Sequence, residues 1–351
     1  MLTVGAILSA AAAEHPGWAF EKHGGRPPLP YALSGRLRDS SVGYFFGNAS
    51  GYNSAEEAAA EAKFGLVGIG WQINNVLSND SHLEAAEIKT ASQLKILRPG
   101  VRVLASRNTE VVSIFWDSVR AAFADISKDS YWVKDVHGRI VQTAWVSPAG
   151  NTPKRWVNFT NRDAASWWAK DYIGPILAGD KLDGIYFDCA CEDPPGVEPV
   201  AFESVKASAQ LAVDNLLPQM AAAGKWVSAW DWDGRLRRSS CATDVRSLLA
   251  RASNYSTLQV LYDFRDTEQT LETSAAALLL ARGPHATLMW PVTGIYEKAS
   301  DFPWNATLLD HDFGQALDEA MEDPPGVFVR HYSNGDVSLD CKEGFARFVL
   351  R

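Results

Sequence analysis

Several chemical signatures are missing from this sequence. Its seven His residues form no His-x-His pair of the kind that metal-dependent hydrolases carry on an early strand. It has no Gly-x-Ser-x-Gly elbow of a serine hydrolase, no block of basic residues, and a formal net charge of −9. No stretch reaches the roughly 18 apolar residues that a membrane-spanning helix needs. We therefore predict no metal, no cofactor, no nucleic-acid partner and no membrane span.

Cysteine is scarce, with four residues in the chain, at positions 189, 191, 241 and 341. Cys189 and Cys191 are too close in sequence to be comfortable mutual partners, and the overall spacing does not suit a four-cysteine metal site. In a secreted chain we expect a Cys191–Cys241 disulfide, because both loops follow neighbouring strands. In a cytosolic chain all four would be buried thiols.

The amino-terminal stretch and the glycosylation sequons favour secretion. An apolar run ends in Ala-Ala-Ala before Glu14, as in a secretory leader, although no basic residues precede it. Residues 1–39 are interpreted as leader and extension, and residues 40–351 as one catalytic domain. Five Asn residues lie in Asn-x-Ser/Thr sequons, which predicts a glycoprotein if the source is a eukaryote: Asn48, Asn79, Asn158, Asn254 and Asn305.

Short apolar runs alternate with segments of helical periodicity along the chain, as in α/β proteins. The predicted strands are Val42–Gly47, Leu66–Trp71, Val101–Ser106, Leu182–Phe187, Trp226–Trp230, Leu258–Tyr262, Ala286–Trp290 and Val327–His331. The predicted helices between them are 54–64, 82–97, 110–125, 163–177, 204–224, 244–253 and 271–283. Eight strand–helix units predict a (β/α)8 TIM barrel. A doubly wound sheet is the competitor, but "FFGNASGYN" lacks the glycine spacing of its phosphate-binding loop.

Two departures from a plain barrel are expected. The interval from Ser106 to Leu182 is too long for one helix, and "YWVKDVHGRIVQTAW" predicts a β-hairpin insertion that turns at His137-Gly138. The tail is expected to begin as the last barrel strand and then to turn at Asn334-Gly335 into a short carboxy-terminal β extension.

The residues just beyond the predicted strands are polar, acidic and aromatic. In barrels of this type the chemistry lies at the carboxyl ends of the strands. These positions hold Asn48, Trp71-Gln72, Arg107-Asn108, Asp188, Asp231 and Asp233, Asp263 and Arg265, Trp290, and Arg330-His331. Four of these residues are Asp, and the 13 Trp of the chain include several near strand ends, where flat apolar rings suit sugars.

Glycoside cleavage needs two carboxyl groups on opposite sides of one bond, and separate strands can hold them at the required distance. Asp188 is the predicted nucleophile or stabilising carboxylate, and Asp231, Asp233 or Asp263 is the predicted partner. The predicted substrate-binding residues are Trp71, Arg107, Asn108, Trp230, Trp232, Arg265 and Trp290. The expected substrate is an oligosaccharide or polysaccharide.

Three motifs, "WVNFTNRDAASWW", "LDGIYFD" and "VFVRHYSNGDV", resemble those of glycoside hydrolase barrels. The chain is also similar to the alpha-galactosidase-like barrels, whose nucleophile is an Asp after strand four and whose acid/base is an Asp after strand six. That resemblance implies Asp188 and Asp263 in these two roles. Amylase-like barrels would instead have a Glu after strand five, where this chain has Asp231 and Asp233.

Competing interpretations remain at this stage. An Asp after a strand is often the N-cap of the next helix, and Asp263 could simply pair with Arg265 or Arg107. No strand end offers the Lys of a Schiff-base aldolase. The sequence thus predicts a glycoside hydrolase or transglycosylase. The alternative is a barrel that binds carbohydrate without cleaving it, as a lectin-like or storage protein does.

Overall fold

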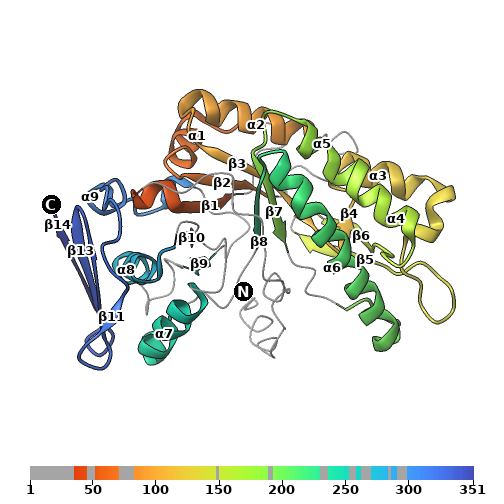
Figure 1. The fold of residues 1–351 in the computed structure, drawn as a ribbon. Coiled ribbons are helices and arrows are strands. Elements are labelled where there is room, and N and C mark those ends of the chain that lie inside the picture. Colours follow the sequence, from red (N-terminus) through yellow and green to blue (C-terminus); the bar gives the residue numbers. More distant parts are fainter. Residues whose placement is uncertain are drawn as a thin grey trace, which may run out of the picture.

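The computed structural model describes ten segments of the 351-residue chain, and the fold is given for these. They are residues 35–45, 52–70, 83–147, 150–188, 193–229, 236–252, 258–261, 270–283, 286–290 and 299–351. The fold is α/β. A curled parallel sheet lies at its centre, helices cover the outside of the curl, and two smaller sheets lie at opposite ends of the molecule (Figure 1).

The central sheet has seven parallel strands in the order β8-β7-β3-β2-β1-β10-β9. Their bounds are β1 Ser41–Phe45, β2 Leu66–Ile69, β3 Arg102–Asn108, β7 Gly184–Asp188, β8 Trp226–Ala229, β9 Leu258–Leu261 and β10 Ala286–Trp290. All seven match predicted strands. Neighbours in the sheet are consecutive among the predicted strands, as in a barrel, except that the seventh, β10, pairs directly with the first, β1. The predicted α/β class and barrel-type sheet are therefore confirmed.

The eighth predicted strand is wrong as a member of this sheet. Residues Val327–Tyr332 form β12, which pairs antiparallel with β11 and β13 in a separate four-stranded sheet. The strands of this sheet are β11 Met321–Glu322, β12 Val327–Tyr332, β13 Gly335–Asp340 and β14 Phe345–Leu350. The carboxy-terminal β extension is confirmed, and the turn predicted at Asn334-Gly335 lies one residue earlier, at residues 333–334.

The helices lie on the outside of the curl. Their bounds are α1 Ala55–Glu61, α2 Leu83–Leu97, α3 Asp117–Ala124, α4 Arg162–Trp167, α5 Gly174–Ala178, α6 Pro199–Ala222, α7 Cys241–Ala252, α8 Leu271–Ala281 and α9 Ala306–Leu309. Ser54 caps α1, since its hydroxyl accepts a hydrogen bond from the Glu57 backbone amide at 3.1 Å. Gly224 follows α6 at φ +64°, a left-handed conformation that glycine adopts without strain.

The predicted insertion between β3 and β7 is present and larger than expected. The chain turns back at residues 137–138, where the Asp135 amide donates to the Arg139 carbonyl at 2.8 Å. A second hairpin follows, formed by β5 Gln142–Ser147 and β6 Gly150–Trp156. The helix predicted over 110–125 is wrong in its first part, because residues 111–113 form β4 Val111–Ser113 against β6. Its β-branched Val pair suits a strand.

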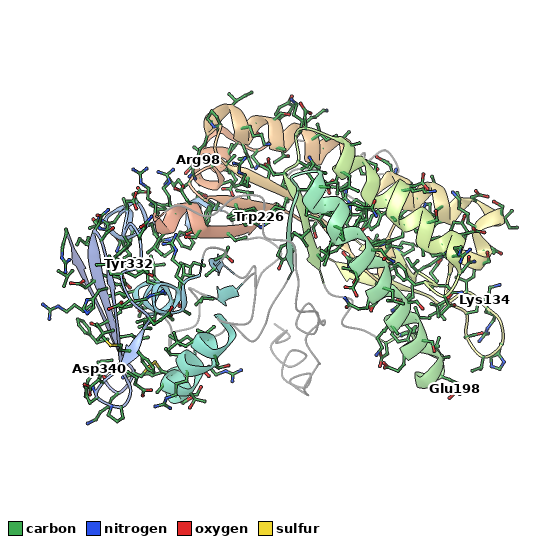
Figure 2. All side chains as sticks on the ribbon, viewed as in Figure 1. Arg98, Lys134, Glu198, Trp226, Tyr332 and Asp340 are labelled. Atoms are coloured by element: carbon green, nitrogen blue, oxygen red, sulfur yellow. A yellow bond between two sulfur atoms is a disulfide. The ribbon has the colours of Figure 1, made fainter. Side chains whose placement is uncertain are left out.

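The carboxy-terminal sheet packs on α8 through buried polar contacts. Arg330, on β12, donates to the carbonyls of Leu279, Leu280 and Arg282 at 2.9–3.2 Å, and so satisfies the end of α8. The Tyr332 hydroxyl also donates to the Leu279 carbonyl, at 2.5 Å. Tyr332 and Asp340 lie at one end of the molecule, and Lys134 of the insertion lies at the other (Figure 2). Arg330 and His331 therefore belong to this packing and do not end a barrel strand.

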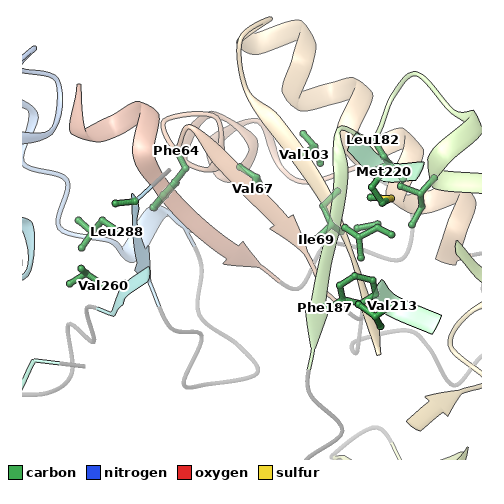
Figure 3. Close-up of a cluster of buried hydrophobic side chains, with 14 of the residues drawn as sticks. Phe64, Val67, Ile69, Val103, Leu182, Phe187, Val213, Met220, Val260 and Leu288 are labelled. Carbon is green, nitrogen blue, oxygen red and sulfur yellow. The ribbon is translucent and has the colours of Figure 1, made fainter. Parts of the chain in front are cut away.

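The apolar core lies between the central sheet and its helices. Figure 3 shows part of one cluster that joins Val67, Ile69 and Val103 of the sheet to Val213 and Met220 of α6. Gly184 is required at the start of β7, because a Cβ there would lie 1.8 Å from the Trp226 carbonyl oxygen. Among the described helices, none is both long and apolar enough to cross a membrane.

Candidate active site

Asp188 is the last residue of β7, and its backbone pairs with Asn108, the last residue of β3. Both residues therefore lie at the carboxyl edge of the parallel sheet, where barrel enzymes carry their chemistry. The side chain of Asp188 lies outside the described part of the structure. The next described helix, α6, has Glu198 as its N-cap, ten residues further on.

Asp183, at the other end of the same motif, has a structural role. Its carboxylate accepts hydrogen bonds from the Val103 amide at 2.8 Å and from Lys95 Nζ at 3.0 Å. These contacts tie the start of β7 to β3 and α2. The two Asp residues of "LDGIYFD" thus lie at opposite edges of the sheet.

Arg107 lies on the helix-covered face of β3. Its guanidinium donates to both carboxylate oxygens of Glu87 on α2, at 2.7 and 2.9 Å, and to the Ser106 carbonyl at 2.7 Å. Trp116 and Tyr172 place their rings 5.5 and 5.3 Å from the guanidinium carbon. Arg107 and Glu87 are each 1 % exposed, so an ion pair within the fold occupies this side chain.

Asn108, the next residue, lies on the opposite face of β3 because side chains alternate along a strand. Its backbone amide donates a hydrogen bond to the Tyr172 hydroxyl at 3.2 Å. Its side-chain Oδ1 is buried and has no hydrogen-bond partner. The predicted sugar-binding residue Asn108 therefore lies beside the backbone of Asp188 with a free acceptor.

Glu110 is a candidate that the sequence-based prediction missed. It is 1 % exposed, and neither carboxyl oxygen has a hydrogen-bond partner among the residues that the structure describes. Burial raises the pKa of this carboxyl to about 8, with smaller increases from Asp193 and Glu203, while Lys206 acts in the opposite direction. Its sequence signal is an acidic residue in the polar "RNTE" segment after a buried strand, but the prediction assigned it to the start of a helix.

The other predicted site residues lie outside the described residues: Trp71, Trp230, Asp231, Trp232, Asp233, Asp263 and Arg265. The backbone of Trp290 ends β10 in register with Gly43, and its side chain is likewise outside the description. No three His, Cys, Asp or Glu residues form a metal-binding group within the described segments.

The expected Cys191–Cys241 disulfide is wrong. Cys241, the first residue of α7, is bonded to Cys341, which follows β13, with a Cα separation of 5.4 Å. The carboxy-terminal sheet, whose strand Val327–His331 the sequence analysis placed in the barrel, brings Cys341 to α7. Cys189 and Cys191 lie outside the described residues.

No protein-family model and no curated protein matches the sequence. Similar solved structures include a GH31 family sulfoquinovosidase from E. rectale (15 % identity, TM-score 0.46), of whose length the chain covers 46 % while 81 % of the chain is aligned. A cyclic alpha-maltosyl-(1→6)-maltose hydrolase from Arthrobacter globiformis has 9 % identity and a TM-score of 0.45 over 90 % of this chain and 99 % of its own. An alpha-galactosidase from Thermus thermophilus has 15 % identity and a TM-score of 0.43 over 92 % and 68 %, respectively.

Proposed function

We propose that the chain is a glycoside hydrolase whose Asp188 is the carboxylate that faces the anomeric carbon of the sugar. The observation that carries the proposal is the position of Asp188. It ends β7 at the carboxyl edge of a curled parallel sheet, next to the free acceptor of Asn108, and Glu198, rather than Asp188, is the N-cap of α6.

The reaction consumes water and breaks the bond between the anomeric carbon and the leaving oxygen. The leaving oxygen takes a proton from a carboxylic acid and departs as an alcohol, and the hydroxyl of water ends on the anomeric carbon. The charge of Asp188 stabilises the oxocarbenium-like transition state. Asp231, Asp233 and Asp263 are the acid candidates that the sequence predicts.

The remaining predicted residues have two proposed roles. Asn108, Arg265 and the aromatic residues Trp71, Trp230, Trp232 and Trp290 are proposed to contact the sugar. For Arg107 we propose a positioning role, because the guanidinium is held by Glu87 and fixes the end of β3. Secretion and glycosylation are also proposals, supported by the leader-like amino terminus, the sequons and the Cys241–Cys341 disulfide.

The test compares Asp188→Asn with Asp183→Asn on nitrophenyl glycosides and on reducing-sugar release from polysaccharides. Asp188→Asn removes the charge but keeps the shape, so we expect a normal melting temperature and a loss of turnover of about three orders of magnitude or more. Asp183→Asn is the matched control, because Asp183 directly precedes the same strand. It should lower stability by breaking the ion pair with Lys95 and leave turnover near normal.

Near-normal turnover by Asp188→Asn would contradict the catalytic role of Asp188. If the wild-type chain binds sugars in calorimetry but hydrolyses none of the substrates, the alternative of a carbohydrate-binding barrel holds instead. The anomer that proton NMR detects first would show whether configuration is retained or inverted.

A further inference from the structure

The carboxyl end of β3 carries a run of buried oxygens without hydrogen-bond partners. They are Asn108 Oδ1, Thr109 Oγ1 and both carboxyl oxygens of Glu110, in residues that are 1–2 % exposed. A buried polar atom without a partner loses its hydrogen bonds to water and gains none in return, so adjacent examples are unusual in a stable fold. Free acceptors at the functional edge of the sheet suit a ligand rich in hydroxyl groups.

Glu110 has charged neighbours, but none of them pairs with it. Lys206, on α6, donates to Glu203 at 2.5 Å and lies 3.8 Å from Asp193. No ion pair within 4.0 Å joins Lys206 to Glu110 among the described residues. Because burial acts more strongly than Lys206, the pKa of Glu110 rises to about 8 and the carboxyl keeps its proton at neutral pH.

Glu110 lies close to Asp188 in the fold. Asn108 and Asp188 are partners in the β3–β7 pairing, and partners on adjacent strands are about 4.8 Å apart. Glu110 is two residues beyond Asn108, which adds at most about 7 Å. The Cα atoms of Glu110 and Asp188 are therefore within about 12 Å, which is compatible with the carboxyl separations of glycosidases, about 5–9.5 Å.

We propose that Glu110 is the proton donor of the reaction and that Asn108 and Thr109 bind the sugar beside it. The inference rests on the proposed glycosidase function and adds an acid on the strand next to Asp188. The proposal gives the two carboxyl groups opposite protonation states, with Glu110 neutral and Asp188 ionised. A neutral, shielded acid beside an ionised carboxylate is the arrangement by which glycosidases separate their two roles.

In the proposed step, the Oε–H of Glu110 gives its proton to the glycosidic oxygen as the bond to the anomeric carbon breaks. The leaving group departs as an alcohol and Glu110 becomes a carboxylate. The proton returns to Glu110 from the water that supplies the new hydroxyl group, directly or through solvent. The carboxyl is shielded in the free chain, so the proposal requires that bound sugar reach it between the ends of β3 and β7.

The decisive variant is Glu110→Gln, which keeps the shape and the neutral charge. We expect kcat/KM to fall about 10²- to 10⁴-fold on nitrophenyl glycosides whose leaving group needs a proton. On the corresponding 2,4-dinitrophenyl glycoside, which departs without one, the loss should be under about tenfold. The alkaline limb of the wild-type kcat/KM profile, near pH 8, should be absent in the variant.

Glu61→Gln is the matched control. Glu61 is also buried with a pKa raised to about 8, chiefly by burial, but it belongs to α1 on the outside of the curl. This variant should keep both the turnover and the alkaline limb. Lys206→Met provides a second test, because without the Lys206 charge the pKa of Glu110 rises and the alkaline limb moves to higher pH.

Several outcomes would overturn the inference. One is a folded Glu110→Gln variant with normal turnover on the poor leaving groups; another is an equal loss on all leaving groups. If Asp263→Asn shows the leaving-group pattern and Glu110→Gln does not, the acid is Asp263. A wild-type chain without hydrolase activity would instead refute the proposed function itself, so the two failures are distinguishable.

Discussion

The buried Arg107–Glu87 pair gives the sharpest stability prediction. Arg107→Met removes the guanidinium that donates two hydrogen bonds to the Glu87 carboxylate, which is 1 % exposed. Among the described residues, the carboxylate then keeps one long contact, from Trp116 Nε1 at 3.4 Å. Burial raises the pKa of the Glu87 carboxyl and Arg107 acts against this, so its charge depends on the arginine. Breaking such a pair from one side costs about 3–5 kcal/mol.

This loss of unfolding free energy should lower the melting temperature measurably. At about 2.1 cal/mol/K per residue, a chain of 351 residues has an unfolding entropy near 0.7 kcal/mol/K, so the melting temperature should fall by about 4–7 °C. The double variant Arg107→Met/Glu87→Met replaces both charges with apolar side chains of similar length. It should recover most of the loss, because well-packed apolar replacements of buried pairs are often nearly neutral.

Differential scanning fluorimetry and urea titration on the single and double variants would measure the coupling between the two residues. A melting temperature for Arg107→Met within about 1 °C of the wild type would refute the reasoning. If stability is unchanged while KM for a glycoside rises, Arg107 contacts the sugar, as the sequence alone predicts.

Two further predictions concern stability. The Cys241–Cys341 disulfide closes a loop with a sequence separation of 100 residues, so Cys241→Ser/Cys341→Ser should cost about 2–5 kcal/mol in urea unfolding; an unchanged midpoint would contradict this. The folded-state pKa of Glu61, about 8, lies above its ordinary value of 4.5, so its stabilisation is full below pH 4.5 and is lost as pH rises through about 8. Glu61→Gln should therefore show a shallower decline of stability between pH 5 and pH 9, and parallel curves would count against a neutral Glu61.

The parallel strands could be predicted because their burial is continuous. Every residue of β2 is buried, as are six of the seven residues of β3, and such strands leave short, nearly unbroken apolar runs. β12 differs, with alternating partly buried and buried residues and with Arg330 among the buried ones. That period-two burial is typical of an antiparallel strand with one face packed. The sequence did not show it, because Val327 and Val329 are on the partly buried side and Arg330 is on the buried one.

The aromatic composition had less predictive value than expected. Six tryptophans are buried in the described fold: Trp116, Trp132, Trp156, Trp167, Trp168 and Trp226. Several of these rings pack against other aromatic rings. The ring of Trp132, for example, contacts those of Phe123 and Trp167. A tryptophan count alone does not separate sugar-stacking side chains from core, because both uses favour large apolar rings.

Long-range partners were the main features that the sequence could not predict. Glu87 is 20 residues before Arg107 and lies in the middle of a helix, where nothing in the local pattern identifies it as the partner of a strand-end arginine. The pairing of Cys241 could not be predicted for the same reason. The position of its partner Cys341 depends on where the carboxy-terminal sheet packs, and one strand of that sheet, Val327–His331, was assigned to the barrel.

The end of β3 shows how one strand serves stability and the proposed chemistry together. Arg107 faces the helices and makes an ion pair, whereas Asn108 lies on the other face with a free acceptor, and Glu110 follows with an unpaired carboxyl. Because the alternation is strict, a shift of one residue in register would exchange the two faces. We expect the ion pair to help fix the register, so that the satisfied charge on one face holds the oxygens without partners in place. The single variant Arg107→Met should therefore lower turnover, because the end of β3 becomes disordered. The double variant Arg107→Met/Glu87→Met, whose apolar side chains pack in place of the ion pair, should restore both turnover and stability.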